Sequence, residues 1–578
     1  MLLKFNDIIP DDCNVLSLSG IFNQEINRIR KAYLDLFESL SKKHNSLEWW
    51  MSFIASKNCS SIPLQLNVTY LFCAINIIKE HSCESKQKRI IFIADSKALI
   101  NVIESFAKKN GLSTYNPKKV YYRTIDNLKI FTFYFGKVGL FLWQTIRFKI
   151  ASKHLKRLPL KSLDKTKTIL IRSWITSGTL SLNGDYSDRN FGSLPKWFKS
   201  KNYQVFILPM YFNINMPIVN LFSLIKKQNV KFLIAEHYLK FIDYVKAIYT
   251  GWKILMIPLK DIYLDGTDVT KIFVEVQRLE GFSNGTLHSY LVYALLKRMK
   301  ESEFKIDKFY YPFENNSNEK SFILGCKKFF RESEIVAFQH TAWYDNQLGM
   351  FLGKNEYKHH PIADKIITSG PIYLDIIKNA GFPEKLIFEG PNLRFKSVHD
   401  KIPGKKKLNE KTNILIPLTV DKNRAYDMLH KVKVISDSLT QVSFFIRRHP
   451  LLNYEDLNFF LKKIEFESFQ YADKGTLNDW LSNTDLILTS GATILIVEAV
   501  CMGIPVIKIE PDNNFLLDPI FWTDYPIKSV NKHHEILEAI EKIFNMTNNE
   551  KEEFEKLGNQ LSLNYFSKVD NNNISVFE

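Results

Sequence analysis

The chain has 578 residues, more than one hydrophobic core can serve, so its length predicts two or three domains. A composition of 45% hydrophobic and 24% charged residues is ordinary for a globular protein. The net charge of +17 favours acidic partners, namely phosphates, nucleotide-activated substrates or an anionic membrane surface. Nucleic acid also fits this charge, but the chain has no zinc-finger, RNP or basic-zipper pattern, and its six cysteines form no CxxC pair.

The first ninety residues are expected to be mainly helical, and the clearest amphipathic run is 26–42. The apolar segment 89–95 predicts a short buried strand, and a helix is expected to follow at 98–109. The polar residues that come directly after the first five predict that the chain has no signal peptide.

The most apolar stretch of the chain, 130–146, is about 17 residues long and contains Lys137, which leaves it short for a membrane-spanning helix. A basic segment, 147–167, follows it. Aromatic-rich apolar surface beside clustered Lys and Arg is typical of a segment that lies on an anionic leaflet. The alternative is a buried helix followed by a solvated linker, and both interpretations stay open.

From 168 onward, apolar runs alternate with polar loops and helical patterns. This alternation predicts a parallel sheet with helices on both faces and ligand-binding residues at the carboxyl ends of its strands. A charged segment with Pro and Gly, 400–411, is the best linker, and a second α/β series begins at 413. The tail 533–566 is expected to be helical and the end at 570–573 disordered. The expected runs are strands at 168–174, 203–209, 230–234, 254–259, 335–340, 365–370, 413–418, 442–446, 486–488 and 505–509, a short strand at 469–472, and a strand that runs into an acidic turn at 308–319.

The segment 484–511 predicts a strand, a tight polar turn, a helix closed by Gly503, and a second strand. Free N–H groups at such a turn form a natural seat for a phosphate, and a carboxylate one helical turn further on can bind a ribose. The chain has neither GxGxxG nor GxxxxGK[ST] here, and a βαβ unit without a ligand remains the alternative. The expected donor-binding residues are Ser490, Gly491, Ala492, Thr493 and Glu498.

His449 and Pro450 follow another strand, directly after Arg447 and Arg448. If this strand and the one before Ser490 are neighbours, an imidazole, a guanidinium and the turn N–H groups converge on one anion. Histidine and arginine can neutralise a leaving phosphate without a metal. His449 is also explained as a capping or core histidine, and one of two adjacent arginines must point away from a shared site.

Three residues at strand ends in the first half are candidates for catalysis: Asp188, Glu314 and His340. A sugar hydroxyl that attacks an anomeric carbon needs a carboxylate or a histidine within hydrogen-bonding reach. Each carboxylate taken alone is also explained by loop or cap chemistry, and Glu314 stands five residues before Glu319, in a pattern that suits a helix cap.

IRRHPLL at 446–452, followed by DLILTSGATILIVEAVCMGIPVI at 485–507, resembles the nucleotide-binding half of GT-B glycosyltransferases. YPFENNSNEK, VAFQHTAWY and GPNLRF resemble the middle of bacterial surface carbohydrate proteins from O-antigen and capsule clusters. The resemblance covers about 168–530. It implies that His449 and the 490–493 turn hold the donor phosphate, that Glu498 contacts the ribose or a nearby backbone group, and that Glu314 and His340 face the acceptor. The ExxxxxxxE pair of many retaining GT-B enzymes is missing, and so is a DxD motif in a suitable context.

The sequence therefore predicts an α/β, GT-B-like protein in which two Rossmann-type domains, 168–400 and 412–578, face a cleft, with a mainly helical extension at 1–167. The expected function is transfer of a sugar from a nucleotide-activated donor to a surface polysaccharide or a lipid-linked glycan at the cytoplasmic face of the membrane. Neither a metal nor a cofactor besides the donor is expected. A CDP-polyol phosphotransferase and a non-catalytic scaffold in polysaccharide assembly are the alternatives.

Overall fold

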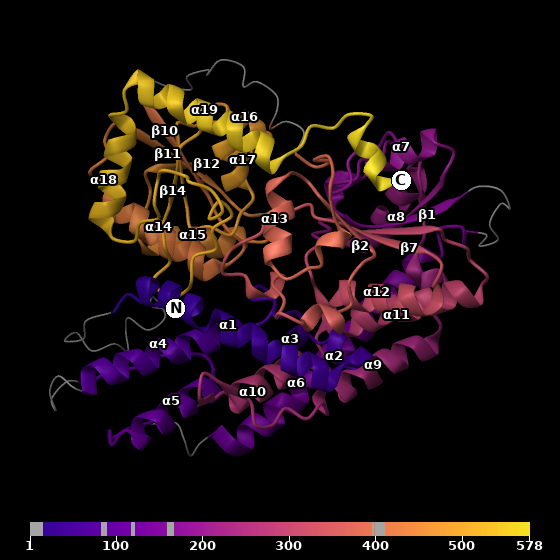
Figure 1. The fold of residues 1–578 in the computed structure, drawn as a ribbon, viewed down its shortest axis with the longest axis horizontal. Helices are drawn as coiled ribbons and strands as arrows, with labels where there is room; N and C mark the ends of the chain where they lie inside the picture. The colour runs from indigo at the N-terminus through magenta and orange to yellow at the C-terminus, as the bar shows by residue number, and fades with distance from the viewer. Residues whose placement is uncertain (1–15, 83–88, 117–121, 159–166, 396–397, 399–410) are drawn as a thin grey trace.

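The computed structural model describes residues 16–82, 89–116, 122–158, 167–395, 398 and 411–578. It contains two parallel sheets with helices packed on them, and a helical N-terminal part lies below both sheets in Figure 1. We call the part built on the first sheet the first lobe (residues 168–395) and the part built on the second sheet the second lobe (residues 412–565). The two lobes and the helical extension confirm the predicted fold class. The predicted linker lies outside the described residues, except for Lys411.

The N-terminal extension is helical throughout its described elements. The expected strand at 89–95 is wrong, because this segment pairs with no described strand, and Ile91 is 57% exposed. The hydroxyl of Ser96 then accepts the N–H of Leu99 and caps the next helix. The helices of the extension are α1 (Ser19–His44), α2 (Leu47–Met51), α3 (Phe53–Ser56), α4 (Leu64–Ser82), α5 (Lys97–Lys109) and α6 (Tyr122–Ser152).

The first lobe is a seven-stranded parallel sheet with the order β3-β2-β1-β6-β7-β8-β9. Its central strands are buried apolar runs, as expected for a sheet covered on both faces. The strands are β1 (Thr168–Ile175), β2 (Gln204–Tyr211), β3 (Lys231–Phe232), β6 (Lys308–Pro312), β7 (Glu334–Phe338), β8 (Lys365–Thr368) and β9 (Ile387–Glu389). A small antiparallel pair, β4 (Tyr263–Leu264) and β5 (Thr267–Asp268), lies outside this sheet.

The helices of the first lobe include one that the sequence misassigns. The expected strand at 254–259 is wrong: its first residues end α9, whose buried residues Tyr244, Ala247 and Ile254 recur at helical spacing. The helices are α7 (Leu194–Ser200), α8 (Ile218–Lys227), α9 (Phe241–Leu255), α10 (Thr270–Glu280), α11 (Asn284–Glu301), α12 (Ser317–Phe329) and α13 (Ile372–Asn379).

The second lobe is a five-stranded parallel sheet with the order β12-β11-β10-β13-β14. Its strands are β10 (Thr412–Pro417), β11 (Val442–Arg447), β12 (Phe469–Tyr471), β13 (Leu486–Thr489) and β14 (Val506–Lys508). Its helices are α14 (Lys422–Ser436), α15 (Tyr454–Lys463), α16 (Leu477–Leu481), α17 (Leu495–Cys501), α18 (His533–Phe544) and α19 (Asn548–Tyr565).

After α19 the chain returns to the first lobe, where Figure 1 places the C-terminus. The expectation of disorder at 570–573 is wrong, because the Asp570 carboxylate accepts the N–H groups of Asn572 and Asn573 and opens a 3-10 helix, Asn573–Phe577. The Phe577 ring is buried against Tyr310 and Phe338. The last residues of the predicted second domain thus pack on the first sheet.

The N-terminal extension is bound to both lobes. On the second lobe, the Leu18 N–H donates to the Asp512 carbonyl (2.9 Å), and the Leu516 N–H donates to the Asn23 side chain (3.0 Å). On the first lobe, the Arg30 guanidinium donates to the Asp345 carbonyl (2.8 Å). The extension therefore fixes how the two lobes sit against each other.

A fully buried ion pair adds to this attachment. The Lys57 ammonium of the extension lies 2.7 Å from the Glu356 carboxylate of the first lobe, and both side chains are completely buried. Burial alone raises the pKa of Glu356, but Lys57 and His360 lower it well below its usual value. Because both groups are removed from water, loss of either partner would leave an uncompensated buried charge at this interface.

Candidate functional site

The site begins at the carboxyl ends of two adjacent strands of the first lobe. Glu314 follows β6 and His340 follows β7, and because these strands are paired, Glu314 Oε1 lies 3.3 Å from His340 Nε2. Burial lowers the pKa of His340, which keeps the imidazole neutral near pH 7. Burial raises the pKa of Glu314, but the hydrogen bond from His340 and the charge of Arg394 lower it more. The result is an ionised carboxylate, one third exposed, beside a neutral buried histidine.

The turn that carries Glu314 is held by a second carboxylate. Glu319, at the start of α12, accepts the N–H groups of Glu314 and Asn315, and Asn315 adopts a left-handed conformation with φ 57°. Burial and the nearby charge of Glu314 raise the pKa of Glu319 to about 8. The capping role considered for Glu314 is therefore taken by Glu319. The Glu314 carboxylate instead accepts hydrogen bonds from the His340 ring and from the Asn316 side chain.

Arg394, which sequence reasoning did not select, lies in the loop after β9. Its Nη1 donates to the His340 carbonyl (3.3 Å). Burial and repulsion by Arg189 lower the pKa of Arg394 to about 10, while Glu498 and Glu314 oppose this shift. Arg394 therefore stays charged near neutral pH. It acts electrostatically on Glu314 of the first lobe and on Glu498 of the second lobe. The sequence signal that was available is its place in the GPNLRF segment.

Arg189 of the first lobe acts electrostatically on His449 of the second lobe. Burial lowers the pKa of His449, and the charges of Arg189 and Arg448 lower it further. The Leu451 N–H donates to His449 Nδ1 (3.2 Å), so the neutral ring carries its proton on Nε2 and can donate there. Arg189 thus acts on His449 of the second lobe and on Arg394 of its own lobe.

The two loops of the first lobe that carry these arginines are in close contact at Gly192. This glycine has φ 50°, and a Cβ on it would lie 2.3 Å from the Leu393 carbonyl oxygen. Only glycine lets the backbones approach this closely. The loop after β1, with Arg189, is therefore fixed against the loop after β9, with Arg394.

Asp188 is fully engaged inside its own loop. Its Oδ1 accepts from the Ser173 hydroxyl (2.9 Å) and from the N–H groups of Asn190 (2.9 Å) and Phe191 (2.8 Å), and its Oδ2 accepts from the Tyr186 hydroxyl (2.6 Å). Only 3% of the residue is exposed, and burial raises its pKa. This arrangement suits a residue that shapes the loop under Arg189, and we do not assign it the base of the reaction.

The expected phosphate turn after β13 is only partly available to a ligand. Gly491 and Ala492 both adopt left-handed backbone conformations, with φ 80° and 56°, and the Ala492 N–H donates to the Leu517 carbonyl (2.9 Å). The Thr493 hydroxyl accepts the Leu495 N–H (3.3 Å). The Ser490 hydroxyl is buried and has no hydrogen-bond partner among the described residues. A phosphate at this turn stays a prediction.

Glu498 of α17 turns toward the first lobe. It is 7% exposed, and burial raises its pKa from 4.5 to about 7, opposed by the charge of Arg394. A carboxylate that is half protonated near neutral pH can donate or accept a hydrogen bond. This property suits the predicted contact with a ribose, which remains a prediction.

The arginines that precede His449 are used for local structure. Arg447 Nη1 donates to the Ala472 carbonyl (2.6 Å), and Arg448 Nη1 donates to the Leu452 carbonyl (2.6 Å), while Pro450 is exposed. The condition that β11 and β13 are neighbours is wrong, because β10 lies between them. The arginines of the first lobe that act electrostatically on second-lobe residues of the expected site are Arg189, on His449, and Arg394, on Glu498.

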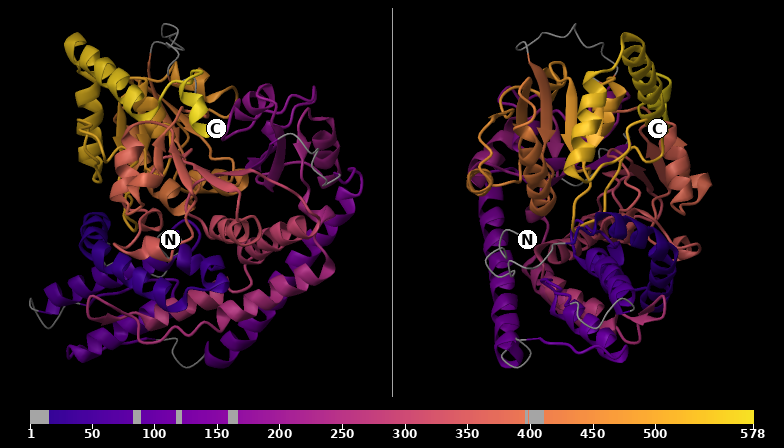
Figure 2. Two further views of the ribbon diagram at one scale, coloured as in Figure 1. Left: turned by 45° about the vertical axis from the view of Figure 1, so that its right-hand side comes forward. Right: turned by 90° about the vertical axis from the view of Figure 1, so that its left-hand side faces the viewer.

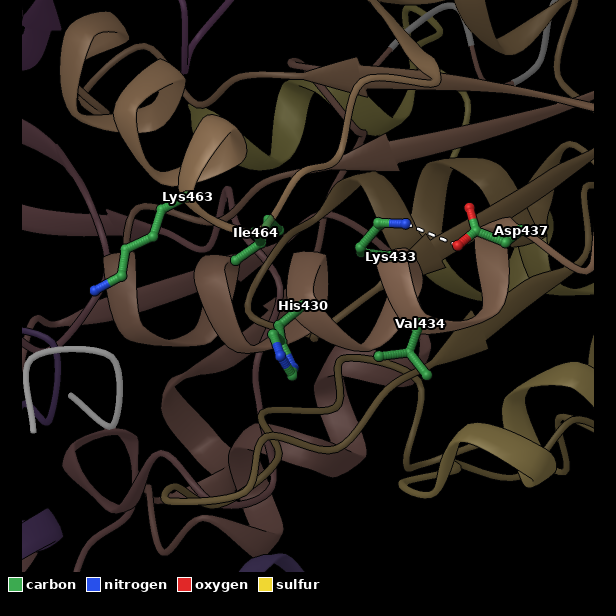
Figure 3. A pocket seen from close by; sticks show the side chains of 6 residues that line it. All are labelled: His430, Lys433, Val434, Asp437, Lys463 and Ile464. Carbon is green, nitrogen blue, oxygen red and sulfur yellow. Dashed lines mark hydrogen bonds and ion pairs between the residues drawn. The ribbon is translucent and has the colours of Figure 1, made fainter. Parts of the chain in front are cut away.

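A separate hollow of about 290 Å³ lies on the outer surface of the second lobe, between α14 and α15 (Figure 3). Its rim includes His430 and Lys463, and Lys433 is already paired with Asp437 at 2.8 Å. None of the residues implicated above lines it. We therefore place the candidate site between the lobes. Within the described ranges, no group of three or more His, Cys, Asp or Glu residues is arranged to hold a metal ion.

No protein-family model matches the chain, and no curated protein matches it in sequence. Solved structures that resemble it include a glycosyltransferase from Rickettsia africae ESF-5, with 12% identity, coverage of 70% of this chain and 95% of that chain, and a TM-score of 0.39. A UDP-GlcNAc 2-epimerase from Neisseria meningitidis bound to UDP-GlcNAc has 10% identity, coverage of 71% and 98%, and a TM-score of 0.39. Acinetobacter baumannii MurG has 11% identity, coverage of 71% and 98%, and a TM-score of 0.36.

All three TM-scores are below 0.5, so these structures are likenesses only. At such identities and TM-scores they carry no argument about the reaction. The fold assignment itself follows from the two parallel sheets and their strand orders.

Proposed function

We propose that the chain is a GT-B-type glycosyltransferase that binds a nucleotide-activated sugar between its lobes and transfers the sugar to a glycan acceptor. The observation that supports this most directly is the set of groups that act on one another across the lobes: Arg189, Arg394 and His449 beside the Glu314–His340 pair. Cationic and N–H donors suit a diphosphate, and an adjacent carboxylate suits an acceptor hydroxyl.

In the proposed reaction, Glu314 accepts the proton of the acceptor hydroxyl as its oxygen attacks the anomeric carbon. The bond from that carbon to the donor phosphate oxygen breaks, and its electron pair leaves with the nucleoside diphosphate. Arg394, Arg189 and the Nε2–H of His449 stabilise the charge that develops on this leaving group. His340 keeps the Glu314 carboxylate in place through its Nε2–H.

The acceptor class and the location belong to the same proposal. We propose that the acceptor is a surface polysaccharide of the O-antigen or capsule type, or its lipid-linked precursor, and that the enzyme works peripherally at the cytoplasmic face of the membrane. The reaction as written uses no metal. Support comes from the net charge of +17 and from the sequence resemblance at 311–320, 336–344 and 390–395.

The test is turnover of nucleotide sugars by purified protein, with the ligand first found by its effect on the melting temperature. Glu314→Gln is expected to lower kcat by about a hundredfold or more with little change in donor affinity, since a positioned base contributes roughly 10²–10⁴-fold. Arg394→Ala is expected to weaken donor binding at least about tenfold. Glu332→Gln and Arg331→Ala, on an exposed turn of the first lobe, are the matched controls.

The products distinguish the alternatives. A glycan lengthened by one sugar, together with free nucleoside diphosphate, supports the proposal. A new phosphodiester in the product would assign a polyol phosphotransferase. Glycan synthesis in cells that is unaffected by Glu314→Gln and by His449→Ala would assign a non-catalytic scaffold.

A further inference from the structure

Helix α9 presents an almost purely apolar face to solvent. Its most exposed large apolar residues are Phe241, at 79%, and the C-cap residue Met256, at 76%. They belong to a stripe at helical spacing that comprises Phe241, Ile242, Val245, Tyr249, Trp252 and Met256. The opposite stripe, which includes Ala247 and Ile254, is buried. Helix α9 is thus apolar on both faces. Packing against the rest of the chain accounts for the buried face but not for the exposed one.

Helix α6 repeats this pattern. Trp143 and Ile150 are 53% and 58% exposed, and Leu140 and Ile146 lie on the same side of the helix. Phe141, on the other side, is buried. The most apolar segment of the sequence is therefore not a buried helix. Among the described residues, no helix is long and apolar enough to cross a membrane.

The two helices are held side by side by direct contacts and by contacts with Phe282, which lies between α10 and α11. The Phe282 ring lies 5.1 Å from the Tyr134 ring of α6 and 5.5 Å from the Trp252 ring of α9. The Phe141 ring lies 6.4 Å from the Tyr244 ring of α9, and Lys149 donates to the Leu239 carbonyl (2.9 Å) just before α9 begins. Figure 1 shows α9 below the first sheet, and Figure 2 shows α6 running from the lower end of the molecule up to the first lobe, where the Phe148 ring of α6 lies 5.2 Å from the Tyr211 ring of β2. We call the exposed sides of the two helices the α6–α9 face.

The charge around the α6–α9 face has one dominant sign. Residues 132–158 contain six Lys or Arg and no Asp or Glu. Around α9, Lys240, Lys246 and Lys260 are exposed, while the only acidic residue within the helix, Asp243, is buried and bound by Arg298 at 2.7 Å. Arg147 lies 4.3 Å over the Trp143 ring, so an exposed aromatic and a cation stand together on the same turn. Apolar side chains within a basic surround are complementary to an anionic lipid surface.

We propose that the α6–α9 face docks on an anionic bilayer. Trp143, Tyr249, Trp252 and Met256 enter the interface between head groups and acyl chains, while the surrounding Lys and Arg pair with lipid phosphates. The docking uses two fixed helices of the folded chain rather than a single basic segment. It does not depend on which sugar is transferred or on whether the chain is an enzyme.

The experiment is cosedimentation of the full-length protein with vesicles of phosphatidylcholine alone, and with vesicles in which about a third of the lipid is phosphatidylglycerol. The anionic vesicles are expected to bind the chain, and binding is expected to weaken as salt is raised. Trp252→Ser combined with Met256→Ser should lower the partition coefficient by about tenfold or more, because both side chains are more than half exposed on the proposed contact surface. Unchanged thermal unfolding of this variant would show that loss of the contact between Trp252 and Phe282 leaves the fold intact.

Two matched controls separate this face from general stickiness. Phe459→Ser with Leu563→Ser removes side chains that are 71% and 58% exposed on the second lobe, and vesicle binding should not change. Lys246→Glu should weaken binding to anionic vesicles, whereas Lys556→Glu on α19 should not.

The proposal fails if the unaltered chain binds neither vesicle, if it binds neutral and anionic vesicles equally, or if the Trp252 and Met256 variant binds as well as the unaltered chain. It also fails if light scattering detects a concentration-dependent dimer that this variant abolishes, since a second copy would then cover the face. None of these readouts uses turnover, so they are independent of the reaction proposed above.

Discussion

Replacement of Asp188 separates a structural role from a catalytic one at a residue that the sequence marks for catalysis. Asp188→Ala removes the acceptor of four hydrogen bonds and leaves the Ser173 hydroxyl and the N–H groups of Asn190 and Phe191 buried without a partner. Each unpaired buried donor costs about 1–3 kcal/mol, and the bonds share one loop, so their effects are not additive. Removal of the buried carboxylate also relieves its desolvation. We expect the loop to lose about 3 kcal/mol, roughly a hundredfold in its opening equilibrium.

Hydrogen exchange of a peptide that covers 186–193 measures this loss directly, because the amides of Asn190 and Phe191 are held by Asp188. Asp188→Ala should speed their exchange about a hundredfold, whereas Asp188→Asn, which keeps an acceptor oxygen, should change it less than about tenfold. Asp188→Asn should also retain most turnover. If Asp188→Asn abolishes turnover while exchange in the loop is unchanged, the carboxylate itself acts in catalysis and the structural interpretation is refuted.

Three further substitutions test charge, tail and extension. Burial raises the pKa of Glu498 from 4.5 to about 7, so its contribution to stability is present below pH 4.5 and is lost as the pH rises through 7. Thermal unfolding is measured at pH 5 and at pH 8. Between these two values, the free energy of unfolding of Glu498→Gln should rise by up to about 3 kcal/mol relative to that of the unaltered chain. Phe577→Ala should destabilise the first lobe by about 3 kcal/mol or more in hydrogen exchange of its strands, with exposed Asn571→Ala as the neutral control. Lys57→Met removes the ammonium partner of the buried Glu356 carboxylate and should lower the free energy of unfolding by about 3–5 kcal/mol in thermal unfolding. The double variant Lys57→Met with Glu356→Gln should restore most of this loss. A double variant no more stable than the single one would contradict this interpretation.

The sequence predicted most strands of both lobes because their central strands are continuous apolar runs between polar loops. The failures share one cause. The segment 89–95 has the composition of a buried strand but meets no strand edge, so it stays extended and partly exposed. The segment 254–259 is apolar because it ends a helix, and an apolar run of this length does not distinguish the two structures.

The candidate site was predictable where it depends on strand order alone. Glu314 and His340 each follow a strand, and the pairing of β6 with β7 brings them within 3.3 Å. Arg189 and Arg394 lie on loops whose approach depends on the contact of Gly192 with the Leu393 carbonyl, and no local pattern reveals that contact. Likewise, the insertion of β10 between β11 and β13 is a matter of topology that the apolar runs do not encode.

The attachment of the extension bears on how the site works. Asn23 and Arg30, both on α1, bind loops of different lobes, and the Asp518 N–H of the second lobe donates to Asp345 Oδ1 (3.3 Å) of the first. Burial and the charge of Asp518 raise the pKa of Asp345 to about 7, and Lys508 pairs with Asp518 at 2.5 Å. These hydrogen bonds and ion pairs lie outside the candidate site, and the chain must break them before the lobes can separate. The groups that face one another across the lobes are therefore held in position before a ligand arrives, and binding energy is not needed to assemble them.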